Sequence, residues 1–515
     1  MEKYIYISSS RDIWWDLMVE VEEERIAKPV FYLGYDDWID KITDRFPNCK
    51  TLEFHEQYWP GQYNINSNEL LVNFTHSARY NKVKDLCFKM MDRVDRVGLL
   101  RMVEREALFH KWCTYATSII EEVKPDFILL SESPHSYLQY LFYELCEFKG
   151  IDSYSFGVIT AISPIMYLRR GISGEKIKVL EKKYSKKLDI RLIDEAKKFL
   201  NSKVQNSNDG NLIEKQIIGD QKQLHLLMIS PGYKFKRFMV EFCKKIIDVI
   251  SFGHANGRII NKLPRQRLWL DKVLFSRAGL SLNAVHSIEE RMFKELERYP
   301  LQKSDNNLHK KFVYFPLHYE PERTSCPDGG EYGDQFNVVA ILRALLPEDI
   351  HIYLKEHPSQ TYRARIGYLG RSTFLYSAIN SMKGVTVLHH SISSENMLKK
   401  SEFCVTLTGT TAIEAALSGK KALIFGKPWY LGCPNTYEYS IDLDIHTLLN
   451  RDLFHSSNVK EWIINFIKQY GFPGIQNPSG QKHFPEFSNS IEFKKAELNS
   501  MIDVVKFVRR ERTYG

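Results

Sequence analysis

The segment Phe403-Cys404-Val405-Thr406-Leu407-Thr408-Gly409-Thr410-Thr411 runs from an apolar, strand-like stretch directly into a polar turn. Two other stretches do the same: residues 311–315 lead into the polar string 316–322, and residues 351–354 lead into Lys355-Glu356-His357-Pro358. Ligands of open parallel α/β sheets bind beyond the carboxyl ends of the strands. If these three stretches are parallel neighbours, their polar strings meet at one edge. The sequence therefore predicts a binding site there, suited to a nucleotide phosphate.

Strand-like and helical patterns alternate in two separate parts of the chain. The first part has strand patterns at 3–8, 29–34, 126–130 and 151–156, with helical patterns at 14–25, 78–123 and 137–148 between them. The second has strand patterns at 311–315, 351–355, 385–388, 402–406 and 421–425, with helical patterns at 334–346, 394–400 and 411–418. Such alternation is typical of parallel sheets. A charged region ending in the loop-like stretch 201–211, and then a basic helical region, separates the two parts.

We therefore expect an α/β protein with two doubly wound, Rossmann-like domains facing each other across a cleft, with helical insertions. The expected boundaries are 1–300 for the N-terminal domain and 301–490 for the C-terminal domain. An amphipathic helix within 491–515 should pack back on the N-terminal domain. One large sheet with insertions is the alternative.

The composition indicates a globular protein with a modest excess of basic residues. Of its 515 residues 43% are hydrophobic and 26% charged, which excludes a disordered chain. The net charge is +8, with basic stretches at 176–187, 234–245 and 258–277. These stretches could contact an anionic ligand or the inner membrane surface, or could simply be solvated faces. Nucleic acid is not expected as a partner, because no nucleic-acid-binding motif is present.

Cysteine usage and hydropathy predict a cytoplasmic location, at most peripheral to the bacterial inner membrane. The chain starts without the apolar stretch of a signal peptide and contains no run of about 18 apolar residues. Its eight cysteines are scattered without close pairs, which favours buried thiols over disulfides or a zinc site; they are Cys49, Cys87, Cys113, Cys146, Cys243, Cys326, Cys404 and Cys433.

The turn Thr408-Gly409-Thr410-Thr411 has the chemistry of an anion site. It lies between a strand pattern and a helical pattern, where free backbone N–H groups and the helix dipole favour a phosphate. Gly409 permits close approach and the threonine hydroxyls add donors. Glu414, in the first turn of that helix, could accept hydrogen bonds from ribose hydroxyls. Ordinary N-capping by threonine would explain the same pattern.

The other two strings add a histidine and carboxylates. His357 follows a strand pattern beside Lys355 and Glu356, and Pro358 ends that element, so His357 could donate to a phosphate oxygen or to a leaving group.

The string 316–322 holds His318, Glu320 and Glu322 in a stretch fixed by two prolines. Its carboxylates could bind sugar hydroxyls or act as a base. The spacing of metal ligands is missing, so we expect no metal and no other cofactor.

Glu132 and His135 follow the strand pattern 126–130 of the first part. By the strand-end rule they face the cleft, where Glu132 could serve as general base for an acceptor hydroxyl. A capped turn into the next helix is the equal alternative.

Together these strings resemble glycosyltransferases of capsular and surface polysaccharide biosynthesis. The resemblance rests on the 315–322 string, on Lys355-Glu356-His357-Pro358, and on Thr408-Gly409-Thr410 with the 414–416 and 419–420 segments, and covers about residues 311–430. The N-terminal string 131–135 is also similar to one found in such proteins. The resemblance implies a GT-B fold, a nucleotide-sugar donor held by the C-terminal domain, and a glycan or lipid-linked acceptor held by the N-terminal one.

The His-Pro pair followed by a hydroxyl-rich turn is also similar to bacterial sialyltransferases and Kdo transferases. That similarity implies that His357 and Thr408, Thr410 or Thr411 hold the donor phosphate, and it favours a CMP-linked donor. Their acidic base motif is not clearly matched, since the 327–330 stretch is a poor substitute. A polyol-phosphate transferase of the teichoic-acid type, a nucleotide-sugar 2-epimerase and a non-catalytic capsule-assembly scaffold are the alternatives.

Overall fold

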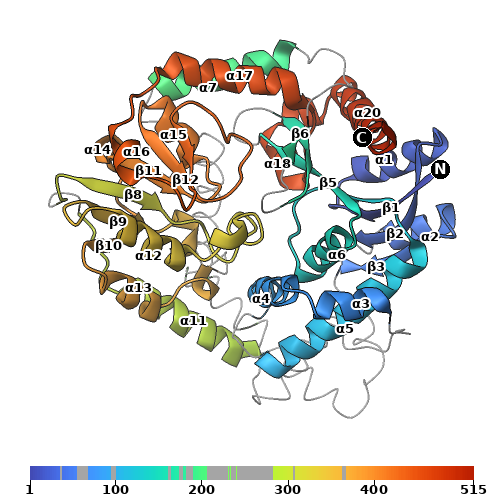
Figure 1. The fold of residues 1–515 in the computed structure, drawn as a ribbon, viewed down its shortest axis with the longest axis horizontal. Coiled ribbons are helices and arrows are strands. Elements are labelled where there is room, and N and C mark those ends of the chain that lie inside the picture. The colour runs from blue at the N-terminus through green and yellow to red at the C-terminus, as the bar shows by residue number, and fades with distance from the viewer. Residues whose placement is uncertain are drawn as a thin grey trace.

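Two α/β halves lie side by side in the computed structural model, with the N-terminal half on the right and the C-terminal half on the left of Figure 1. The structure describes residues 1–34, 38–54, 68–93, 95, 100–159, 164–172, 178–180, 190–205, 230, 232, 239 and 282–514 apart from 305–307 and 362–366. The basic stretches 234–245 and 258–277 lie outside the described residues, except for 239, as does most of 176–187. Residues 206–211 of the loop-like stretch also lie outside them.

The N-terminal sheet has the strand order β14-β6-β5-β4-β1-β2-β3, with β7 paired to β6. The pairs β4–β5, β4–β1, β1–β2 and β2–β3 are parallel, whereas β6 pairs antiparallel with β5, β7 and β14. The strands are β1 (Glu2–Ile7), β2 (Ala27–Gly34), β3 (Lys50–Glu53), β4 (Phe127–Leu130), β5 (Asp152–Val158), β6 (Ile165–Arg170), β7 (Lys178–Val179) and β14 (Gly471–Pro473).

Both faces of this sheet are buried, which explains why its strands read as continuous apolar runs. Ile5 and Phe31 belong to one hydrophobic core, and their strand neighbours Tyr4 and Tyr32 belong to another. The helices of this half are α1 (Asp12–Glu23), α2 (Ile39–Arg45), α3 (Glu69–Thr75), α4 (Arg79–Met91), α5 (Met102–Val123) and α6 (Tyr137–Phe148). Helix α7 (Ile190–Gln205) instead packs on the C-terminal half, against the helices at Thr411–Leu417 and Ser456–Tyr470 (Figure 1). Helix α6 begins at a capping box of Ser136 and Gln139, which fixes the turn after β4.

The C-terminal sheet is parallel throughout, in the order β10-β9-β8-β11-β12-β13. Its strands are β8 (Phe312–Pro316), β9 (His351–Lys355), β10 (Val385–Leu388), β11 (Phe403–Thr406), β12 (Lys421–Ile424) and β13 (Thr436–Glu438). Strands β9, β8 and β11 are adjacent, so the three polar strings do leave the sheet side by side. The expected pair of parallel-dominated α/β sheets is confirmed.

Helices cover both faces of the C-terminal sheet (Figure 1). They are α11 (Leu282–Arg298), α12 (Gln335–Leu345), α13 (Thr373–Asn380), α14 (Ser394–Lys400), α15 (Thr411–Leu417), α16 (Ile445–Asn450) and α17 (Ser456–Tyr470), with 3-10 segments at Gly330–Tyr332, Pro358–Thr361 and Gly367–Leu369. No helix in the described part of the chain is long and apolar enough to cross a bilayer.

After α17 the chain returns to the N-terminal half. Strand β14, at residues 471–473, joins the N-terminal sheet. The chain therefore leaves the C-terminal half before residue 490, where we expected that domain to end. Helices α18 (Pro478–His483), α19 (Pro485–Ser488) and α20 (Ile491–Tyr514) follow, and α20 lies against α1 (Figure 1). The fully buried ion pair between Arg11 and Glu497, at 2.7 Å, joins the loop before α1 to α20.

Candidate active site

A cavity of about 420 Å³ lies between the two halves, and all three polar strings contribute to its wall. This volume is in the range of small-molecule sites. The N-terminal half supplies Ser133, Phe156, Gly157, Val158, Tyr167 and Arg169. The C-terminal half supplies Pro316, Leu317, His318, Tyr319, Glu322, Arg323, Thr324, Asp328, His357, Ser359, Thr406, Thr408, Gly409, Thr410, Thr411, Lys427, Pro428, Trp429 and Tyr430, and the returning segment supplies Gln476.

His318 holds the first string to the third. Its Nε2 lies 3.0 Å from Thr406 Oγ1 and accepts a hydrogen bond from the backbone N–H of Leu407 at 3.3 Å. Its Nδ1 lies 3.4 Å from Thr324 Oγ1. Because Nε2 accepts, the ring is neutral and carries its proton on Nδ1. Burial lowers the pKa of His318 to about 3, with further contributions from His357 and Arg371.

The low pKa of His318 makes stability depend on pH. The unfolded chain binds a proton at this residue below about pH 6.5, whereas the folded protein does not until about pH 3. Stability is therefore complete above about pH 6.5 and is lost as the pH falls towards 3, by roughly 1.4 kcal/mol per unit from this residue. We expect the parent to lose free energy of unfolding between pH 7 and pH 5 in urea titrations. This loss should be about 2 kcal/mol smaller in His318→Gln. Equal pH dependence of the two proteins would contradict the assignment.

The threonine turn presents its groups to the cavity unequally. Thr406 Oγ1 accepts a hydrogen bond from the backbone N–H of Gly409 at 3.0 Å, which fixes the turn to the end of β11. Thr408 Oγ1 donates to the backbone oxygen of Thr324 at 2.8 Å, so this hydroxyl secures the neighbouring loop. Thr410 directly precedes α15 and is exposed, and its side chain makes no hydrogen bond that caps the helix. Glu414 is half-buried one turn into α15 and does not line the cavity.

A Cβ atom at Gly409 would lie 2.7 Å from Thr406 Oγ1 and 3.3 Å from the His318 ring. Glycine is therefore required where the turn passes closest to His318.

His357 lies half-buried in the cavity wall, two residues after the end of β9. The backbone N–H of Ser359 donates to His357 Nδ1 at 3.1 Å. A neutral His357 ring must therefore carry its proton on Nε2 and can act as a hydrogen-bond donor there.

Several of the predicted donor residues support the wall without lining it. Glu356 is buried and its Oε1 accepts from Arg371 Nε at 2.7 Å, while Arg371 also donates to the backbone oxygen of His318 at 2.9 Å. Lys355 is buried and donates to Ser394. Glu320 is buried, and its Oε1 accepts from Gln335 Nε2 at 2.9 Å. Pro358 opens the 3-10 segment behind His357.

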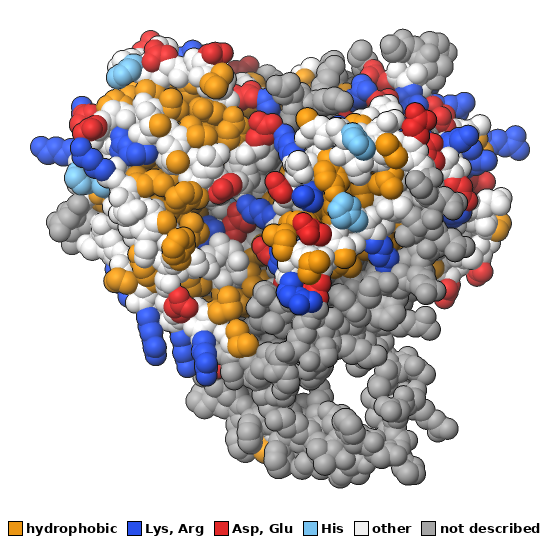
Figure 2. Space-filling model, turned by 60° about the horizontal axis from the view of Figure 1, so that its bottom comes forward, with side chains coloured by type: hydrophobic (Ala, Val, Ile, Leu, Met, Phe, Trp, Pro, Cys, Tyr) orange, Lys and Arg blue, Asp and Glu red, His pale blue; other side chains and the backbone are white. Residues whose placement is uncertain are grey.

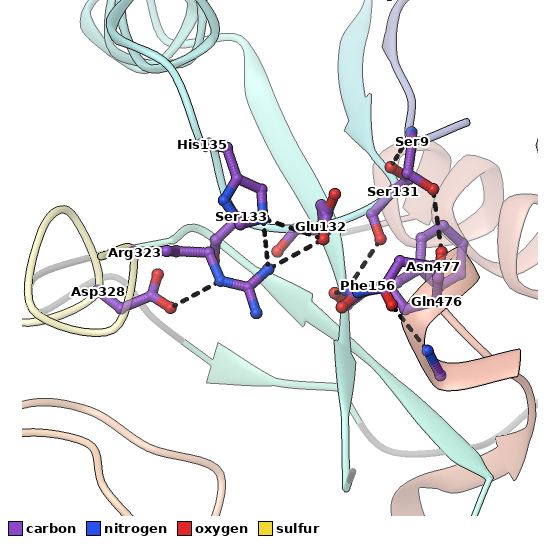
Figure 3. A network of polar contacts seen from close by, with 12 residues as sticks. Ser9, Ser131, Glu132, Ser133, His135, Phe156, Arg323, Asp328, Gln476 and Asn477 are labelled. Atoms are coloured by element: carbon purple, nitrogen blue, oxygen red, sulfur yellow. Dashed lines mark hydrogen bonds and ion pairs between the residues drawn. The ribbon is translucent and has the colours of Figure 1, made fainter. Parts of the chain in front are cut away.

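Glu132 lies in a cluster of charges that joins the two halves (Figure 3). Its Oε2 is 3.1 Å from Arg323 Nη1 and 3.3 Å from His135 Nε2, and Arg323 Nε is 3.8 Å from Asp328 Oδ2. Burial would raise the pKa of Glu132, but His135, Arg323 and a hydrogen bond from Asn477 outweigh it and lower that pKa. Neither Glu132 nor His135 lines the cavity itself. An ionised carboxylate bound in this way is a better anchor for Arg323 than a proton acceptor.

Glu322, in contrast, does line the cavity. Burial would raise its pKa, but the nearby charges of His135, Arg323 and Arg93 and a hydrogen bond from the backbone N–H of Arg323 lower it.

The loop that carries these residues is fastened to the N-terminal half at several further points. Cys326 is packed in the N-terminal hydrophobic core. Lys89 on α4 donates to the backbone oxygen of Gly333 at 2.6 Å, and Lys82 pairs with Glu331 at 2.6 Å. On the face shown in Figure 2, basic and acidic side chains are intermixed along the junction of the halves. The two halves are therefore held in contact by charge pairs as well as by β14.

The sequence did not point to Arg169, Arg323, Lys427, Trp429, Tyr430 or Gln476. Arg169 lies on β6 and Arg323 on the long loop after β8. Lys427, Trp429 and Tyr430 lie on the loop after β12, and Gln476 lies on the returning segment. Only the strand-end position of the 427–430 segment, after β12, offered a signal. Among the described residues, no cluster of three or more His, Cys, Asp or Glu side chains could hold a metal ion.

Residues 287–457 match the family model described as capsule polysaccharide biosynthesis protein. The match includes the whole of 311–430, where we expected the resemblance, and all cavity-lining residues of the C-terminal half. A comparison with curated proteins gave no match.

Solved structures give weak matches. Thermosulfurimonas dismutans KpsC, a beta Kdo 2,4 transferase, is 16% identical over 36% of this chain and 57% of that chain, with a TM-score of 0.21. A beta Kdo 2,7 transferase structure of the same KpsC is 12% identical over 95% and 99%, with a TM-score of 0.29. Methanocaldococcus jannaschii UDP-GlcNAc 2-epimerase is 11% identical over 91% and 99%, with a TM-score of 0.22. Because these TM-scores are below 0.5, we base the function on the site and on the family model.

Proposed function

We propose that this protein is a capsule-related glycosyltransferase, which moves a sugar from a nucleotide-activated donor to a surface polysaccharide or lipid-linked glycan. The observation that carries the proposal is the convergence of the threonine turn and His357 on one cavity that both halves line. A parallel sheet binds its ligand at this edge. The family model that matches residues 287–457 supports the same reaction class.

The wall of the cavity has the mixture of groups that a nucleotide sugar needs. Trp429 and Tyr430 offer aromatic surface for a base, and Lys427 lies beside them with a cationic head. Thr410, Thr411 and His357 offer donors for the phosphate. For the donor we favour a CMP-linked sugar, because the His-Pro pair and the hydroxyl-rich turn resemble those of CMP-dependent transferases.

In the reaction, hydrogen bonds to the phosphate would stabilise the charge that develops as the glycosidic bond breaks. His357 Nε2–H is one such donor, and the neutral state of His318 keeps the turn that carries Thr410 in place. The N-terminal wall would hold the acceptor. We assign Glu132 and His135 to positioning Arg323 at the contact between the halves.

Two matched substitutions test the donor assignment. Thr410→Val removes a hydroxyl that makes no capping bond, so we expect nucleotide affinity to fall about tenfold while the melting temperature is unchanged. Thr408→Val removes the bond to Thr324 and should lower the melting temperature with a smaller loss of affinity. Calorimetry measures the melting temperature of each variant and its affinity for CMP, UDP and GDP. Equal affinities in Thr410→Val and the parent would contradict the assignment.

Product analysis tests the reaction itself. Incubation with CMP-, UDP- and GDP-linked sugars and a capsule oligosaccharide should give a product heavier by one sugar residue in mass spectrometry. A product heavier by a phosphodiester unit would instead identify a polyol-phosphate transferase.

A further inference from the structure

Gln476 reaches across the carboxyl ends of two strands in the N-terminal sheet. It follows β14, lies 4% exposed and lines the cavity. Its backbone oxygen accepts from Ser9 Oγ at 3.0 Å and from Trp14 Nε1 at 2.9 Å. Its side-chain Nε2 donates to the backbone oxygens of Ser131 at 3.0 Å and Phe156 at 2.6 Å (Figure 3). Both ends of the residue are therefore fixed, and its side chain has one orientation.

That orientation leaves a buried acceptor. The two partners of Nε2 are carbonyl oxygens, which only accept, so the amide cannot be turned round. The other amide atom, Oε1, is buried and has no hydrogen-bond donor among the described residues. A buried carbonyl without a donor is unfavourable, and the rest of the residue is too well anchored to relieve it by rotation. A ligand that brings a donor to this wall would gain a hydrogen bond that the described part of the chain does not make.

A second acceptor on the same cavity has similar chemistry. Asp328 Oδ1 is buried and has no hydrogen bond from the residues that the structure describes, although Arg169 lies 3.8 Å away as an ion partner. Phe156 and Tyr167 contribute apolar surface to this side of the cavity. Buried acceptors beside aromatic surface suit a sugar, which carries hydroxyl donors around an apolar ring face. The groups that we propose for the phosphate, Thr410, Thr411 and His357, belong to the C-terminal half.

We propose that Gln476 Oε1 accepts a hydrogen bond from one hydroxyl of the acceptor sugar and so positions it on the N-terminal wall. This inference rests on the proposed glycosyl transfer and adds to it a residue that selects the acceptor. Gln476 is a positioning residue, because the assigned bond orients a hydroxyl that need not be the one that reacts.

A coupling experiment separates recognition from a structural role. The probes are methyl glycosides of glucose, galactose and N-acetylglucosamine with their monodeoxy analogues, and binding is measured by saturation-transfer NMR in the presence of CMP. For the parent protein, we expect one monodeoxy analogue to bind about tenfold more weakly than the methyl glycoside that keeps the missing hydroxyl. In Gln476→Met the two should bind equally. Ser9→Ala is the matched control, because it removes one anchor of Gln476 but keeps Oε1, and the tenfold difference should persist.

Three results would overturn the inference. The tenfold difference between a glycoside and its monodeoxy analogue could persist in Gln476→Met. That variant could instead bind all glycosides and analogues more weakly by the same factor. Finally, no glycoside could bind the parent protein. Failure of the proposed function gives a different result, because neither CMP, UDP nor GDP would then raise the melting temperature of the parent. The glycoside comparison can in that case be repeated without nucleotide.

Discussion

Replacing His357 with alanine should lower the rate of sugar transfer by about 100-fold or more while leaving the melting temperature within a degree or two of the parent. The ring is half-buried in the cavity wall, and Ser359 fixes its Nδ1 as the acceptor, so Nε2–H is presented as a preoriented donor. Loss of one preorganised donor to developing charge typically costs 10² to 10³ in rate. Steady-state turnover with the nucleotide sugar that proves to be the donor measures the effect.

His351→Ala is the matched control for this prediction. His351 lies on the same strand, β9, and its Nε2 is 2.9 Å from Thr386 Oγ1, away from the cavity. It should retain normal turnover. His357→Gln keeps an N–H donor and should recover part of the lost rate. Turnover within threefold of the parent in His357→Ala would show that the ring has no part in transfer.

The second large effect is expected from Arg323→Met. The Arg323 side chain is 20% exposed and holds Glu132, His135 and Asp328 together at the contact between the halves. Removing it leaves the carboxylate of Glu132 buried with one partner fewer, and breaking a buried ion pair typically costs about 3 to 5 kcal/mol. We therefore expect the free energy of unfolding to fall by about 3 kcal/mol in urea titrations, together with a loss of transfer activity.

An exposed pair across the same contact provides the control. Lys82 and Glu331 are 50% and 65% exposed, so Lys82→Met should change stability by less than about 1 kcal/mol. Adding Glu132→Gln to Arg323→Met should restore part of the stability, because the isolated charge is then gone. If the double variant is as unstable as the sum of the single ones, the Arg323–Glu132 pair does not couple the halves.

The sequence predicted the C-terminal half well because its signals are local. The three apolar stretches end in polar strings, and parallel pairing of β9, β8 and β11 brings those strings together. Chemistry at the end of each strand could be read without knowing the rest of the fold, which is why His357 and the threonine turn were predicted to lie at one edge.

The same reasoning could not separate lining residues from supporting ones. Glu356 and Lys355 point into the protein and make buried contacts with Arg371 and Ser394, respectively. Strand-end position alone does not say which side a side chain takes, because that depends on distant partners. Thr408 and Thr410 were equivalent in sequence, but only Thr408 is bound to Thr324.

The N-terminal wall was the least predictable part of the site. Glu132 was expected as a base, yet Arg323, which is distant in sequence, binds its carboxylate. Gln476 reaches the cavity from a segment that joins the sheet through an antiparallel strand after the second domain is complete. Neither contact has a local signature, so only the tertiary structure reveals them.

A crystal structure with bound CMP tests the central claim most directly. The account predicts electron density for the nucleotide in the cavity of about 420 Å³ between the halves, with its phosphate within hydrogen-bonding distance of Thr410 and His357 Nε2. Density at another site, with this cavity empty, would contradict the account.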